Sequence, residues 1–231
     1  MDWTASSTFE WTSTISNFKA KQKAAQVLAA RIESGQIIGI GSGSTAYLAI
    51  QEIARRMKSE RLSFLGIPTS LEVRLVCARV GIACTSLIEH RPDWAFDGAD
   101  EVDNDGNMIK GRGGAFYTEK LVAGAARKLF ILVDRSKLVT RLGAKFPIPV
   151  EVHPPAIRWV EQQICDLGAS EVNVRAAAGK DGPLITEHGN IVLDVRFPEI
   201  TPDLEKELKS RCGIIESGLF WGYKPEIIIA D

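Results

Sequence analysis

Short apolar runs alternate with helical stretches along residues 19–145, and this alternation constrains the fold more than any other feature. Runs such as QIIGI, LSFLGI, WAFD and LFILVD have the length and composition of buried strands. The stretches between them carry apolar residues at helical spacing. Strands that alternate with helices predict a parallel sheet with right-handed crossovers. We therefore predict an α/β fold, with a doubly wound, mostly parallel sheet and a smaller α+β lid domain.

The pattern changes after about residue 145, where KFPIPVEVHPP leads into a helix and several strands joined by turns. This pattern is typical of an α+β domain, which we place at residues 145–212. The catalytic domain would comprise residues 19–144 and 213–231, because the last apolar strand is expected to return to the first sheet. Residues 1–18 are rich in Ser and Thr, and we interpret them as an N-terminal extension.

The composition is that of a globular protein without a dedicated nucleic-acid-binding surface. The 231 residues are 45% hydrophobic and carry a formal net charge of -1, whereas nucleic-acid binders usually present a basic face. The scattered cysteines show no CxxC spacing, which favours reduced thiols over disulfides or a zinc site. No apolar run approaches the ~20 residues of a membrane span. The start of the chain lacks the pattern of a secretory signal. We therefore expect a cytoplasmic protein with no membrane or nucleic-acid partner.

The motif GIGSGSTA, residues 39–46, follows a predicted strand and precedes a predicted helix. Backbone N–H groups, hydroxyls and the partial positive charge of a helix N-terminus can surround an anion at such a place. The motif lacks the third glycine of a dinucleotide fingerprint and the lysine of a P-loop. A phosphate or polyol cradle therefore fits better than a dinucleotide site. A tight strand-to-helix turn closed by a Ser/Thr cap is the alternative.

Six carboxylates, three cations and five glycines share the stretch DGADEVDNDGNMIKGRGGAFYTEK, residues 97–120. Asp97 and Asp100 directly follow an apolar strand, so we expect them at the edge of the sheet, where water is partly excluded. Lys110 precedes a run of small residues that would let a ligand approach the backbone, and Glu119 begins the next helix. A carboxylate that takes a proton from carbon, with a cation or N–H groups around the resulting enediolate oxygen, is one chemistry that this set can serve. The other acids are expected in a solvated turn: Glu101, Asp103 and Asp105.

The order of the motifs resembles the ribose-5-phosphate isomerase A family. GIGSGSTA, GIPTS, FDGADEVD, MIKGRGGAFYTEKLVA, VDRSKLV, LGAKFPIPVEV and GNIVLDVRF follow one another as is typical of that family, from about residue 19 onwards. The resemblance implies an aldose–ketose isomerase of the pentose phosphate pathway, which interconverts D-ribose 5-phosphate and D-ribulose 5-phosphate through an enediolate. It implies a small sugar phosphate as ligand, no metal and no organic cofactor, and a homodimer or homotetramer.

The resemblance also implies roles for individual residues. Glu119 would move the proton between C1 and C2, and Lys110 would stabilise the oxyanion. Asp97, with Asp100 beside it, would assist ring opening and hydroxyl proton transfer. Arg112 replaces a glycine common in the family, and it would either point to solvent or contact a phosphate or another subunit. The implied substrate-binding residues are Lys21, Ser42, Gly43, Ser44, Thr45, Gly111, Arg112, Gly113, Gly114 and Lys137.

Two alternatives remain open from the sequence. A sugar-phosphate deaminase on a related fold would be expected to carry a catalytic histidine near the acids, and none lies between Trp94 and His153. A non-catalytic sugar-phosphate sensor, similar to repressor effector domains, would be expected to carry a helix-turn-helix segment. Residues 1–18 are too short and too uncharged for one. The presence of the acids and the lysine together favours catalysis over sensing.

Overall fold

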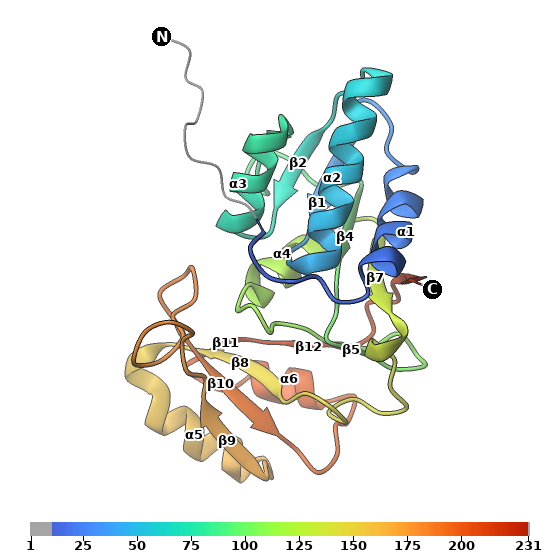
Figure 1. The fold of residues 1–231 in the computed structure, drawn as a ribbon. Coiled ribbons are helices and arrows are strands. Elements are labelled where there is room, and N and C mark those ends of the chain that lie inside the picture. Colours follow the sequence, from blue (N-terminus) through green and yellow to red (C-terminus); the bar gives the residue numbers. More distant parts are fainter. Residues whose placement is uncertain (1–10, 231) are drawn as a thin grey trace. The chain divides into compact units, whose positions relative to one another are not determined.

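The structure, a computed structural model, describes residues 11–230 of the chain. The chain forms two compact units (Figure 1). Of the described residues, the first unit contains 11–98, 121–136 and 225–230, and the second contains 99–120 and 137–224. Residues 1–10 of the predicted N-terminal extension lie outside the described residues.

The first unit contains a six-stranded parallel sheet in the order β13-β7-β4-β1-β2-β3. The chain builds the sheet outward from β1 to one edge and then from β4 to the other, which is the doubly wound order. The predicted α/β fold class is therefore confirmed, and the last strand, β13, lies at one edge of this sheet. The strands are β1 (Ile37–Ile40), β2 (Leu65–Pro68), β3 (Ala83–Cys84), β4 (Trp94–Asp97), β7 (Leu129–Asp134) and β13 (Glu226–Ala230).

Helices cover both faces of this sheet, which is why the interior residues of its strands are mostly apolar. Helices α1 (Phe18–Ala29), α2 (Gly43–Glu60) and α3 (Leu71–Val80) share one apolar core with Ile38 and Ile40 of β1. The intervening Gly39 faces the other side, where a Cβ on it would come within 2.4 Å of Val122 Cγ1 in α4 (Phe116–Ala125). Successive residues of β1 thus face different helices, as the strand period requires. None of the helices in the described range is long and apolar enough to span a membrane.

The second unit contains a four-stranded antiparallel sheet in the order β11-β8-β10-β9. Apolar residues of two helices, among them Val160 and Leu208, share the core of this unit with strand residues such as Val150 and Leu193. The α+β character predicted for this part of the chain is therefore confirmed. Its elements are β8 (Ile148–Val152), η2 (Pro154–Ala156), α5 (Ile157–Asp166), β9 (Glu171–Val174), β10 (Ile191–Arg196), α6 (Leu204–Lys209) and β11 (Ile214–Ser217).

A second, three-stranded antiparallel sheet in this unit has the order β12-β6-β5. The sequence did not predict it, because each of its strands is only two residues long. The chain passes from β11 to this sheet at Gly218, whose N–H donates to the Pro149 carbonyl and whose carbonyl accepts from the Lys110 N–H. A Cβ at Gly218 would come within 2.1 Å of the Lys110 carbonyl oxygen, so only glycine fits there. The strands are β5 (Glu101–Val102), β6 (Met108–Ile109) and β12 (Leu219–Phe220).

The prediction that Glu101 lies in a solvated turn is wrong. Its side chain is fully buried, and its carboxylate accepts hydrogen bonds from the backbone N–H groups of Gly143, Lys145 and Phe146. A buried carboxylate is stable when N–H groups replace the water that it has lost. Asp105, in the same acidic stretch, is exposed as predicted. Burial of an acid in this stretch therefore depends on whether the fold brings backbone N–H groups from elsewhere in the chain to its carboxylate.

Candidate active site

The predicted cradle begins just after β1, with Ser42 as the N-cap of α2 and Gly43 to Thr45 as the first residues of that helix. Ser42 has extended backbone geometry, and its side chain makes no capping hydrogen bond to α2 within the described chain. Its backbone N–H instead donates to Asp97 Oδ1 at 3.0 Å, and the Gly41 N–H donates to the Phe96 carbonyl at 2.8 Å. The loop is therefore fastened to the end of the neighbouring strand β4.

Asp97 ends β4 and is only 5% exposed. Its Oδ1 atom accepts hydrogen bonds from the N–H groups of Ser42, at 3.0 Å, and of Gly98, at 2.7 Å. A Cβ at Gly41 would come within 2.2 Å of the Asp97 carboxyl carbon, so the absence of a side chain at residue 41 admits this carboxylate. β1 and β4 are the neighbours at which the strand order reverses, and ligands bind at this point in doubly wound sheets.

Lys21, predicted as a phosphate contact, is a buried cation beside the cradle. Its Nζ atom lies 3.2 Å from Ser44 Oγ and 3.8 Å from Asp134 Oδ2 at the end of β7. Burial alone would raise the pKa of Asp134, but hydrogen bonds from Ser136 and Asn17 and the charge of Lys21 together lower it. Asp134 therefore stays ionised and supplies a counter-charge to Lys21. This role of Asp134 was not predicted, although the motif VDRSK at the end of a predicted strand marks the position.

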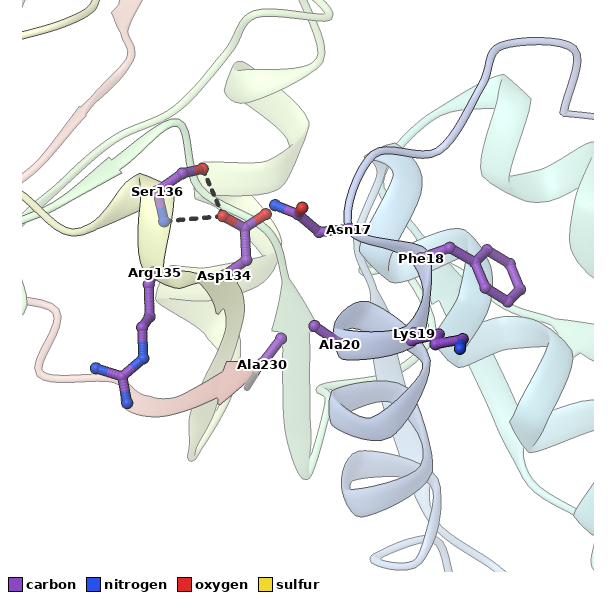
Figure 2. A pocket seen from close by; sticks show the side chains of 8 residues that line it. All are labelled: Asn17, Phe18, Lys19, Ala20, Asp134, Arg135, Ser136 and Ala230. Carbon is purple, nitrogen blue, oxygen red and sulfur yellow. Dashed lines mark hydrogen bonds between the residues drawn. The ribbon is translucent and has the colours of Figure 1, made fainter.

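An open pocket of about 890 Å³ in the first unit adjoins Asp134 (Figure 2). Figure 2 shows Ser136 hydrogen-bonded to the Asp134 carboxylate, and the side chain of Asn17 directed toward the same group. The pocket thus lies at the carboxyl ends of β7 and β13. Its lining residues are Asn17, Phe18, Lys19, Ala20, Asp134, Arg135, Ser136 and Ala230.

Lys110 and Glu119 form a buried ion pair in the second unit. Their Nζ and Oε2 atoms are 2.9 Å apart, and each side chain is 5% exposed. Lys110 follows β6, and its Nζ atom also lies 5.5 Å from the centre of the Phe220 ring. Removing one member of such a pair leaves the other charge buried without its counter-charge, which is strongly unfavourable. The pair offers a carboxylate that can exchange a proton and a cation that can hold a negative oxygen.

The glycine loop, residues 111–114, connects Lys110 to the start of α4. Gly111 has φ 110°, and a Cβ there would come within 2.5 Å of Phe116 Cδ1. The Arg112 N–H donates to Asp100 Oδ2 at 3.0 Å, so the Asp100 carboxylate holds the backbone of this loop. The Arg112 side chain is exposed, which agrees with the first of its two predicted orientations.

The structure therefore gathers the predicted site residues into two groups, one within each unit. The group in the first unit is Lys21, Ser42, Gly43, Ser44, Thr45 and Asp97. The group in the second unit is Asp100, Lys110, Gly111, Arg112, Gly113, Gly114 and Glu119. Lys137 also belongs to the second unit, where its Nζ atom lies 5.1 Å from the centre of the Phe146 ring.

Comparisons with known proteins assign the family. The profile of ribose 5-phosphate isomerase A (phosphoriboisomerase A) matches residues 65–231. The ribose-5-phosphate isomerase A of Methanothermobacter thermautotrophicus is 45% identical over 210 residues, which are 90% of this chain and 92% of the relative. The solved ribose 5-phosphate isomerase A of Methanocaldococcus jannaschii is 39% identical, with a TM-score of 0.89 over 94% of this chain and 96% of that one. A D-ribose-5-phosphate isomerase solved in complex with phospho-erythronic acid is 36% identical, with a TM-score of 0.90 and the same coverage. The chain therefore belongs to the ribose 5-phosphate isomerase A family of enzymes.

Proposed function

We propose that this chain interconverts D-ribose 5-phosphate and D-ribulose 5-phosphate through an enediolate, in the non-oxidative branch of the pentose phosphate pathway. The observation that carries the proposal is the buried ion pair of Lys110 and Glu119 beside the glycine loop, in a chain of this family. A phosphorylated sugar acid, phospho-erythronic acid, is the ligand of one relative, which also supports a sugar phosphate as substrate.

Each charged group has a separate role in the proposed proton transfers. In the aldose-to-ketose direction, Glu119 takes the proton from C2, the electrons of that C–H bond form the C1–C2 double bond, and O1 becomes negative. Lys110 holds this oxygen. The hydroxyl proton then passes from O2 to O1, with Asp97 as the proposed carrier, and Glu119 returns its proton to C1. No proton is gained or lost over the cycle, so the reaction consumes no co-reactant.

The positive charge on Lys110 lets the proposed reaction proceed without a metal or an organic cofactor. A buried cation fixed in advance stabilises a developing oxyanion far more than it would in water, because little solvent screens it. The residues that the family resemblance implies as substrate contacts stay part of the proposal, with Lys21, the cradle hydroxyls and Lys137 as polar contacts. The family resemblance also supports a homodimer or homotetramer, which light scattering of the purified protein would test.

The test of the proposed base is turnover of ribose 5-phosphate by Glu119→Gln. The amide keeps the shape of the side chain but cannot take the proton, so we expect turnover to fall roughly 10²- to 10⁴-fold. Asp105→Asn, which neutralises an exposed acid of the same stretch, should turn over like the original protein. Turnover by Glu119→Gln close to that of the original protein would remove Glu119 from the role of base. Binding of ribose 5-phosphate without turnover by the original protein would favour the sensor.

A further inference from the structure

Arg175 contacts the glycine loop, although it belongs to none of the motifs discussed above. It follows β9, and its Nη1 atom donates to the carbonyl oxygens of Gly111, at 2.7 Å, and of Arg112, at 3.1 Å. The guanidinium is fixed from its other edge by Asp194 of β10, which accepts from Nε at 3.0 Å and also from Nη2. The side chain of Arg175 is only 15% exposed. A guanidinium held by a two-bond contact to a carboxylate has one orientation, so its remaining N–H groups point in a fixed direction.

The peptide group that joins Gly111 to Arg112 is held at both of its polar ends. Its carbonyl accepts from the Arg175 guanidinium, and its N–H donates to the Asp100 carboxylate at 3.0 Å. A cation at the oxygen end and an anion at the hydrogen end match the dipole of the peptide. Glycine backbone rotates between conformations more freely than any other residue, and Gly111 already has φ 110°. The two charged contacts therefore decide which way this peptide faces.

The backbone of Lys110 is held on both sides, by this peptide and by a hydrogen bond to Gly218. Its own N–H donates to the Gly218 carbonyl at 2.8 Å, and its side chain reaches Glu119 at 2.9 Å. The backbone on one side of Lys110 is thus fixed by Gly218, and the backbone on the other side is fixed by the Gly111–Arg112 peptide. A rotation of that peptide would displace the lysine from Glu119.

We propose that Arg175 is a positioning residue of the isomerase. Together with Asp194 and Asp100, it fixes the Gly111–Arg112 peptide and, through it, holds Lys110 in alignment with Glu119. This inference rests on the proposed function, because the aligned pair is the one that moves the proton and holds the enediolate oxygen. The charge on that oxygen is greatest in the transition state, so misalignment lowers kcat more than it raises KM. A displacement of about 1 Å in such a group can cost roughly 100-fold in rate.

The test compares Arg175→Lys with Arg196→Lys. Lysine keeps the positive charge but lacks the planar fork, so it cannot contact Asp194 and the two carbonyls in the same geometry. Arg196 is the matched control, because it pairs with Glu171 at 3.5 Å across the same two strands, β9 and β10. We expect Arg175→Lys to lower kcat roughly 10- to 100-fold with little change in KM, and Arg196→Lys to leave both unchanged. In Arg175→Ala, added guanidinium ion should restore part of kcat, which would not occur if the residue merely supported folding.

Hydrogen exchange separates this inference from the proposed function, because it needs no turnover. We expect the amides of residues 111–114 to exchange at least about tenfold faster in Arg175→Lys, while they keep their original rate in Arg196→Lys. Equal exchange and equal kcat in the two variants would overturn the role of Arg175. Absence of turnover by the original protein would instead overturn the proposed function, and the exchange rates alone would then decide whether Arg175 fixes the loop.

Discussion

Replacing Glu101 with glutamine would test the buried carboxylate that the sequence had placed in solvent. Oε1 accepts hydrogen bonds from the N–H groups of Lys145 and Phe146, and Oε2 accepts one from Gly143 at 2.7 Å. A glutamine amide has a single acceptor oxygen, and its NH₂ group is a donor. At least one of the three backbone N–H groups would therefore face another donor in the interior of the second unit.

The expected loss of stability follows from these contacts. A buried N–H group left without an acceptor costs about 1–3 kcal/mol, and each remaining hydrogen bond loses about 1 kcal/mol when its acceptor is no longer charged. For one lost and two weakened bonds, Glu101→Gln should lower the free energy of unfolding by about 3–5 kcal/mol. For a chain of this size, that corresponds to a fall in Tm of roughly 6–20 °C.

Thermal unfolding followed by circular dichroism measures this loss directly. Asp105→Asn is the control, because it neutralises an exposed acid of the same stretch and should change stability by no more than about 0.5 kcal/mol. A Tm of Glu101→Gln within about 2 °C of the original protein would refute the reasoning. It would mean that the carboxylate contributes nothing beyond what a neutral amide supplies.

Two further predictions concern the close approach of Gly41 to Asp97 and the loss of stability at low pH that Glu216 causes. Gly41→Ala would place a Cβ 2.2 Å from the Asp97 carboxyl carbon, so turnover should fall. Gly124→Ala is the control and should turn over normally, because its Cβ would meet nothing within 4 Å beyond the backbone of its own helix; equal rates in the two variants would contradict the close approach. Burial alone would raise the pKa of Glu216, but the charge of Lys120 and several hydrogen bonds lower it below its ordinary 4.5. The stability that Glu216 supplies is therefore complete above about pH 4.5 and is lost as the pH falls through the lowered pKa. Denaturant unfolding at about pH 7 and about pH 3 should show a smaller acid loss in Glu216→Gln, and an identical loss would contradict the shift.

The parallel sheet could be predicted because its signals are local. The strand runs that end in Ile40, Asp97 and Asp134 are apolar up to those last residues, and the segments between them carry apolar residues at helical spacing. The likeness of the motifs to one family could also be found in the sequence, and the comparisons confirm the family. The roles of individual site residues and the domain boundaries near residues 145 and 212 stay predictions.

The contacts that the sequence could not give are those between distant residues. Glu101 finds its N–H partners more than 40 residues later, and Arg175 reaches back more than 60 residues to the glycine loop. The local sequence does not distinguish either residue from an exposed charged residue, because the burial of a charged side chain depends on which backbone groups the fold brings to it. The small sheet to which Glu101 belongs was missed because its strands are only two residues long and one of them comes from residues 219–220.

Conversion of ribose 5-phosphate in deuterated buffer with excess chelator, followed by NMR, tests the central claim most directly. Proton transfer through an enediolate predicts D-ribulose 5-phosphate that carries deuterium at C1, formed at the same rate with and without the chelator. Conversion that the chelator stops would contradict the metal-free route. Product that stays free of deuterium even after long equilibration would contradict the enediolate itself.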